Sequence, residues 1–294
     1  MDLLETRELR YFVTVAEELH FGRAAERLGI AQPPLSRAIQ RLERRLGVRL
    51  LERDRRGVAL TDPGRVLLVE ARTTLDAATA AVHRTRRAAS SRERLVLATK
   101  AGADHELLRE LLDAYAAEPD AVEVEVVLCG IGEQRRLLRD GRADAALLHR
   151  PFDPLAEFDT EDLLTVGRIA VLPAGHPLAT RPSLSMAEVT GLPDLPAARW
   201  PDHDGNYPPG PGPEFRDQSQ LAQMIALGRA TVVICASAHT WLWDEHTAVP
   251  LTDAPPITTV LAWPPHSRSP ALAGLVRAAG RLEGHRRVGR AATR

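Results

Sequence analysis

The sequence predicts a mixed α/β fold in which a small helical head with a β wing is joined by one long helix to a two-lobed body. Three observations support this prediction. Apolar stripes at helical spacing fill much of the first 60 residues, an unbroken helical pattern follows to about residue 91, and beyond residue 92 short apolar strands alternate with helices. The length of 294 residues agrees, because two domains and a connector are expected at this size.

The head, residues 1–60, is predicted to contain three short helices. The apolar face of the first consists of Leu9, Phe12, Val13, Ala16 and Leu19. The second ends at Gly29, as a left-handed C-cap would, and the third has Pro33 in its first turn. One face of the third helix is apolar, and the opposite face carries Ser36, Arg37, Gln40, Arg41 and Arg44. A helix, a tight turn and a helix with a polar outer face together place a recognition helix in the major groove of DNA.

A two-stranded wing is predicted after Gly47. The first strand leads into residues 52–56, a turn follows at Gly57, and residues 58–60 form the second strand. The arginines near its tip, Arg53, Arg55 and Arg56, suit a phosphate backbone or a minor groove.

The charge distribution also separates the head from the body. Residues 1–92 hold 18 arginines against 12 acidic residues, a balance of +6, and the remainder holds 20 basic and 27 acidic residues, a balance of −7. A basic head on an acidic body indicates that only the head approaches a polyanion.

These residues resemble the LysR-type transcriptional regulators over about 60 positions without a gap. The similar segments are FGRAAERL (21–28), AQPPLSRAI (31–39), LE (42–43), GVRLLER (47–53) and LTDPG (60–64). Departures from the family pattern are Ala31 in place of a capping Ser, Leu51 in place of Phe, and Asp62-Pro63 in place of Glu-Ala. The resemblance implies sequence-specific binding to double-stranded operator or promoter DNA. The expected DNA-binding residues are Gln32, Pro33, Pro34, Ser36, Arg37, Gln40, Arg41, Arg53, Arg55 and Arg56.

Residues 61–91 are predicted to form a linker helix that Thr61 caps. Its apolar seam consists of Leu68, Ala71, Leu75, Ala78 and Val82, which spans two heptads. By the family resemblance this helix pairs antiparallel with that of a second subunit, giving a dimer or a tetramer. The alternative is a single helix that packs on its own domain.

The body, residues 92–285, is predicted to be an effector-binding module of two α/β lobes with parallel sheets, shaped like a periplasmic binding protein. Lobe 1 is expected at about 92–163 and 256–285, and lobe 2 at about 164–255. Residues 140–146 and 172–178 are similar to the LysR-type effector module, whereas the similarity is lost in a loop at about 190–213. Residues 286–294 are expected to be a disordered tail.

A ligand site is expected in the crevice between the lobes, beyond the carboxyl ends of the strands. The candidate effector-binding residues are Thr99, Lys100, Ile131, Gly132, His149, Gln218 and Ser219. Thr99 stands where the family commonly uses a hydroxyl, whereas a second common hydroxyl is absent at Ile131-Gly132. Lys100, the chain's single lysine, favours an anionic effector, although a solvated lysine on a loop is the alternative.

Other functions find little support in the sequence. The ten histidines show no compact metal-ligand spacing and no nucleophile motif is present, so neither a metal, a cofactor nor catalysis is expected. Cys129 and Cys235 lie far apart, as in proteins of a reducing cytoplasm, and no membrane span is evident. Two alternatives to a ligand-responsive, nucleoid-associated regulator remain, namely a cytoplasmic solute-binding or enzymatic α/β protein and a nucleoid protein that binds DNA without sequence preference.

Overall fold

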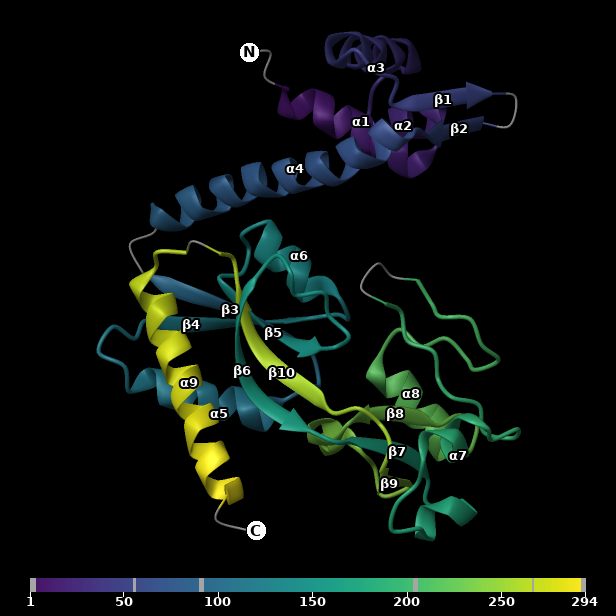
Figure 1. Cartoon of the computed structure of the whole chain (residues 1–294), viewed down its shortest axis with the longest axis vertical. Helices are drawn as coiled ribbons and strands as arrows, with labels where there is room; N and C mark the ends of the chain where they lie inside the picture. The colour runs from purple at the N-terminus through teal and green to yellow at the C-terminus, as the bar shows by residue number, and fades with distance from the viewer. Residues whose placement is uncertain (1–3, 55–56, 90–92, 203–205, 266, 292–294) are drawn as a thin grey trace. The chain divides into compact units, whose positions relative to one another are not determined.

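The computed structural model describes residues 4–54, 57–89, 93–202, 206–265 and 267–291 (Figure 1). The chain divides into two units. The first comprises residues 1–90 with 139–141, and the second comprises 91–138 with 142–294. Among the described helices, none combines the length and the apolarity that a bilayer crossing requires.

The head of the first unit contains the three predicted helices and the predicted wing. These elements are α1 (Thr6–Glu18), α2 (Phe21–Leu28), α3 (Gln32–Leu46), β1 (Leu51–Asp54) and β2 (Gly57–Leu60). Their apolar faces meet in one core, where Phe12, Leu35 and Leu42 are fully buried. Gly29 and Gly47 end α2 and α3 with φ of 65° and 70°, conformations that glycine adopts without strain. Ala31 precedes α3 without a side-chain cap, as its sequence implies.

The wing is fastened to α3 by one carboxylate. Glu43 Oε1 accepts hydrogen bonds from the backbone N–H groups of Leu50 and Leu51, at 2.9 and 3.2 Å. Both leucines are buried, so this carboxylate satisfies two donors that water does not reach. Glu43 therefore fixes the position of the wing relative to the recognition helix.

In the helix α4 (Asp62–Ala88), part of the face that was predicted to pair with a second subunit packs on the head instead. Thr61 Oγ1 accepts a hydrogen bond from Gly64 N at 3.0 Å and caps the helix as expected. However, Leu68, Ala71 and Leu75 pack against the core of their own head. The sequence alone could not identify the face of this helix that meets a partner, because apolar residues three and four positions apart fit more than one face.

The first lobe of the second unit is built on a five-stranded sheet in the order β4-β3-β5-β10-β6. Its strands are β3 (Arg94–Lys100), β4 (Glu123–Cys129), β5 (Ala145–Arg150), β6 (Asp159–Val166) and β10 (Ile257–Trp263). The β3 strand pairs parallel with β4 and β5, whereas β10 pairs antiparallel with β5 and β6. The helices of this lobe are α5 (His105–Ala116), α6 (Glu133–Arg139) and α9 (Pro270–Ala291).

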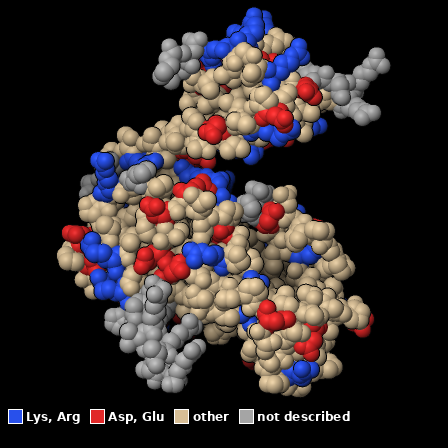
Figure 2. Space-filling model, viewed as in Figure 1, with Lys and Arg blue, Asp and Glu red and all other residues tan. Residues whose placement is uncertain are grey.

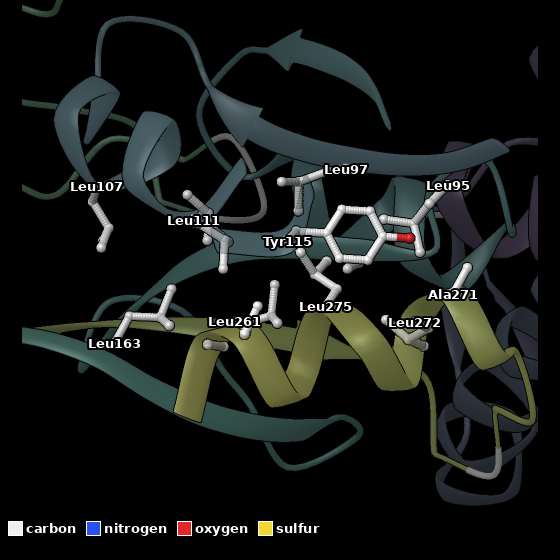
Figure 3. Close-up of a cluster of buried hydrophobic side chains, with 14 residues drawn as sticks. Leu95, Leu97, Leu107, Leu111, Tyr115, Leu163, Leu261, Ala271, Leu272 and Leu275 are labelled. Atoms are coloured by element: carbon white, nitrogen blue, oxygen red, sulfur yellow. The ribbon is translucent and has the colours of Figure 1, made fainter. Parts of the chain in front are cut away.

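Strand alternation sends successive side chains of this sheet to two different cores. Leu95 and Leu97 of β3 join the core beneath α5 and α9, where Tyr115 is buried (Figure 3). Val96 and Ala98 join the core on the opposite face, which α6 covers. Glu118, just beyond α5, accepts hydrogen bonds from Arg277 and Arg281 of α9 and ties these two helices together.

The second lobe has a three-stranded sheet in the order β8-β7-β9. Its elements are β7 (Arg168–Pro173), α7 (Met186–Thr190), α8 (Gln218–Ala226), β8 (Val232–Cys235), β9 (His246–Pro250) and the 3-10 helices η1 (Pro177–Thr180) and η2 (Ala236–Trp241). Both strand pairings are antiparallel, so the prediction of parallel sheets is wrong for this lobe. An apolar strand buried on both faces has the same pattern in either direction, and β9 was not anticipated. Within the loop predicted at 190–213, single bridges join Ala197 to Thr231 and Arg199 to Glu214.

The chain passes from one lobe to the other at Gly167, between β6 and β7, and returns in β10. The first lobe thus extends to Val166, a few residues beyond the predicted boundary at 163. The C-terminal helix α9 continues to Ala291, so the expectation of a disordered tail from residue 286 is wrong as far as residue 291. The sequence suggested a tail because no apolar period follows Leu282.

Candidate functional site

The outer face of α3 is polar, as the sequence predicted. Its buried residues all turn into the head, and its exposed residues include Gln32, Pro33, Pro34, Arg37, Gln40 and Arg41, with Ser36 half-buried. Arginine side chains gather over this part of the head (Figure 2). The face therefore offers hydrogen-bond donors to a duplex without exposing core residues.

The arginines of this helix divide into two groups. Arg45 hydrogen-bonds to Glu8 of α1, and although burial opposes ionisation of that carboxyl, the bond from Arg45 lowers the pKa of Glu8. Arg45 is thus engaged within the head. Arg37 and Arg44 are exposed and form no ion pair with any residue that the structure describes. Arg53 lies in β1, paired with Val58, and Arg55 and Arg56, at the predicted wing tip, lie outside the described residues.

In the second unit, several candidate effector-binding residues lie where β3, β4 and β5 end. Thr99 and Lys100 are the last residues of β3, and His149 is the penultimate residue of β5. The ends of β3 and β4 are joined, because Ala101 N donates to Cys129 O at 3.0 Å and Cys129 Sγ donates to Thr99 O at 3.4 Å. Half-buried Ile131 and Gly132 follow in the next loop.

Two buried hydroxyls at this edge have no partner. Thr99, His149 and Thr259 continue the alternation of Leu97, Leu147 and Leu261, and therefore share the sheet face that α5 covers. Thr99 is 1% exposed and Thr259 is fully buried, yet neither Oγ1 forms a hydrogen bond with the described residues. Such groups are rare in folded proteins, and a ligand or water would satisfy them.

The Lys100 ammonium is also without a hydrogen bond. It lies 5.7 Å from the centroid of the Trp200 ring, a cation–π distance, and forms no ion pair or hydrogen bond with the described part of the chain. Burial lowers the pKa of Lys100, and the negative charges of Asp104 and Asp153 oppose that change. Lys100 is not the solvated loop lysine that the sequence left open.

Asp104, at the start of α5, has contacts that the sequence did not indicate. It is 3% exposed, its Oδ2 lies 2.5 Å from His149 Nε2, and its Oδ1 accepts a hydrogen bond from Ser237 Oγ at 2.9 Å. Burial opposes ionisation, but these bonds and the charge of Lys100 hold the pKa of Asp104 below its ordinary value. His149 is fixed further, because its backbone N–H donates to Asp153 Oδ2 at 2.8 Å.

Residues of the second lobe reach this edge. Ser237, in η2, also lies 2.9 Å from Cys235 Sγ. The side chain of Gln218, at the start of α8, lies so close to Gly102 that a Cβ on this glycine would fall 1.9 Å from Gln218 Oε1. Ser219 is exposed beside it. The structure therefore brings Thr99, Lys100, His149 and Gln218 to the same end of the first-lobe sheet.

Sequence reasoning missed Asp104, Ser237 and Thr259. In the sequence Asp104 marks only the start of a helix, because an Asp at that place carries no signal for contacts with another lobe. Ser237 lies 133 positions away from it. Thr259 lies beside Thr258 at the start of an otherwise apolar strand, and a threonine in such a strand signals a buried hydroxyl that is costly without a partner.

Comparison with known families gives two matches. Residues 6–65 match the family described as bacterial regulatory helix-turn-helix protein, lysR family, and residues 88–282 match the LysR substrate binding domain. Among curated proteins, the transcriptional regulator AlsR of Bacillus subtilis is 33% identical over 201 residues, which is 67% of this chain and just under two thirds (66%) of AlsR. The regulator IlvR of Caulobacter vibrioides is 31% identical and covers 93% of this chain and 97% of its own length.

Among solved structures, full-length BenM superposes with a TM-score of 0.53. It is 27% identical to this chain, and the match covers 96% of this chain and 98% of the BenM chain. The similarity therefore extends over the head, the linker helix and both lobes.

Proposed function

The chain belongs to the LysR family of bacterial transcriptional regulators, and from this premise we propose that it is a sequence-specific regulator switched by a small anionic effector. In this proposal α3 and the wing bind operator DNA, and the effector binds at the end of β3. The relatives are regulators, and no catalytic step or cofactor is part of the proposal. Because its target is DNA, the protein acts in the cytoplasm on the nucleoid.

One observation carries the effector site: at the end of β3 a half-buried lysine and a buried hydroxyl follow each other in sequence, and neither has a hydrogen-bond partner among the described residues. An unpaired charge away from water is costly, and so is an unsatisfied polar group. An anionic group bound at this strand end would pair with the Lys100 ammonium, and one of its oxygens or a bound water would satisfy Thr99 Oγ1. His149, Gln218, Ser219 and the Ile131-Gly132 loop are assigned to the surrounding wall.

The test uses an operator fragment located by footprinting the DNA that flanks the coding region. Titration with a panel of small carboxylates identifies one that changes operator binding. Thr99→Val and Lys100→Met should abolish that response and leave operator binding by the unliganded protein intact. The control Arg136→Met alters an exposed residue of α6 and should change neither. A normal response in the double variant would refute this placement.

For the DNA site, exposed Arg37 and Gln32 at the start of α3 are assigned to base edges. Guanine accepts two hydrogen bonds from an arginine, and adenine accepts one from a glutamine amide and donates one to it. Ser36, Gln40 and Arg41 complete this face, and Arg53, Arg55 and Arg56 are assigned to the phosphate backbone. Operator affinity should fall steeply with salt, and affinity for competitor DNA should be far weaker. Equal affinity for both would favour a nucleoid protein without sequence preference.

Assembly into a dimer or a tetramer is proposed through α4. Its exposed large apolar residues are Val66, Val69 and Val82, whose exposed fractions are 65%, 64% and 47%. Val66 and Val69 lie one turn apart and would pair with a second α4. Leu75 is unsuitable as a test position, because it packs against its own head.

A further inference from the structure

Asp104 occupies a position where aspartate normally caps a helix, but its side chain does not cap. It is the N-cap residue of α5, and its carboxylate accepts no hydrogen bond from the first turn of that helix. Its backbone is left-handed, with φ of 50° and ψ of 30°, which is uncommon for a residue other than glycine.

The same chain contains a matched comparison. Asp217 is the N-cap residue of α8, has extended backbone angles of −139° and 162°, and accepts a hydrogen bond from Gln220 N at 2.9 Å. Asp104 therefore has the residue type and the position of a cap, but neither the conformation nor the bond. Its Oδ1, which a cap would use, is instead held by Ser237 of the second lobe.

The uncapped turn follows shortly after the strand end that carries Thr99 and Lys100, and the charge of Lys100 acts on the Asp104 carboxylate. The N–H groups of Glu106 and Leu107 occupy the positions that a capping oxygen would satisfy, and they carry the positive end of the α5 dipole. Thr99 Oγ1, buried and without a partner, independently indicates a missing ligand at this strand edge.

We propose that the Asp104 carboxylate alternates between bridging the lobes and capping α5, so that the second lobe controls access of the effector's anionic group to the α5 N-terminus. While Ser237 holds Oδ1, the first turn of α5 is open to an anion. When the second lobe withdraws, Oδ1 is released, the backbone of Asp104 relaxes to the extended region, and the carboxylate caps the helix. His149 retains Oδ2 in both states.

This device lets Ser237 of the second lobe act on the effector site through Asp104, without Ser237 itself contacting the effector. The internal carboxylate and an external anion compete for the same N–H groups, so only one can occupy them. Binding of the effector therefore favours the conformation in which Ser237 holds Asp104, and the lobes are coupled to occupancy. The inference rests on the proposed function, which places the effector at Thr99 and Lys100.

Amide hydrogen exchange in the full-length protein tests the device without any ligand. Ser237→Ala should slow exchange of the Glu106 and Leu107 amides by about fivefold, the factor expected when one capping bond forms. Ser237→Thr keeps the hydroxyl and should leave the rates as in the wild type, and Thr240→Ala, an exposed position of η2, is the control. If Ser237 merely packs, Ser237→Ala should leave these amides unchanged or make them exchange faster, and either result would overturn the proposal.

Acetate serves as a carboxylate probe, against chloride at the same ionic strength. Ser237→Ala should weaken acetate binding about fivefold, because the cap now competes for the N–H groups. The double variant Asp104→Ala/Ser237→Ala lacks the competitor and should regain the wild-type affinity. A double variant no better than Ser237→Ala would count against the device. If acetate binding does not depend on Thr99 or Lys100, the proposed effector site is wrong. The exchange rates of the Glu106 and Leu107 amides still test the role of Asp104 in that case.

Discussion

Replacing Glu43 by alanine should loosen the wing from the recognition helix. The Glu43 carboxylate accepts hydrogen bonds from Leu50 N and Leu51 N, and these leucines are only 1% and 4% exposed. Glu43→Ala would leave two buried donors unsatisfied. A hydrogen bond to a charged acceptor contributes about 1.5–3 kcal/mol, so the pair could contribute about 3–6 kcal/mol. Because Glu43 is only half-buried and water can partly replace it, we expect a loss of about 2–3 kcal/mol.

Amide exchange at Leu50 and Leu51 measures this loss directly. A change of 2–3 kcal/mol corresponds to exchange that is roughly 30- to 140-fold faster. Glu43→Gln keeps an acceptor and should lose only about 1 kcal/mol, since neutral hydrogen bonds are weaker. Glu52→Ala, on the exposed side of β1, is the control. Affinity should fall for all DNA sequences together, because the wing is assigned to the backbone. If Glu43→Gln were as damaging as Glu43→Ala, or if exchange were unchanged, the anchoring role would be wrong.

Four further outcomes are expected. Arg37→Ala should cost about 1–3 kcal/mol at one operator base pair and relax the preference there, as measured with single-base operator variants. Val69→Glu should give smaller species in sedimentation and reduce operator affinity, and an unchanged mass would argue against pairing through α4. Burial raises the pKa of Cys129 from 9.0 to about 11, so at pH 8 its thiolate fraction is about 100-fold below that of a thiol whose pKa is 9.0. Labelling of Cys129 by a disulfide reagent should therefore be slower by a similar factor until the protein unfolds. The hydrogen bond from Arg281 lowers the pKa of Glu118 below its ordinary value of 4.5. The stability that this pair contributes is therefore present above pH 4.5 and is lost as the pH falls through the lowered pKa of the folded protein. Glu118→Gln should flatten this acid dependence in thermal melts.

The head could be predicted from the sequence because its structure is determined locally. The spacing of Leu35, Ile39 and Leu42 defines the buried face of α3 and leaves Arg37 outside, and Gly29 marks where α2 ends. Each of these signals lies within a few residues of the feature that it predicts.

The candidate site was predicted only in part, for the opposite reason. The end of β3 could be located, so Thr99 and Lys100 were found. The direction in which the Asp104 carboxylate turns depends on Ser237 in the other lobe, and no local pattern encodes that contact. The face of α4 that meets the head was also ambiguous, since Leu75 and Val69 both fit a helical stripe and only the packed core distinguishes them.

The place of β10 in its sheet has a consequence for how the protein is made. This strand lies between β5 and β6, yet it is translated after the entire second lobe. The head and α4 can fold once residue 89 has left the ribosome, while the second lobe and β10 are still to emerge. Until residue 263 emerges, β5 and β6 keep open edges of the kind that pair with other chains. A nascent chain that stalls in this interval therefore carries a finished DNA-binding head on a body prone to aggregation.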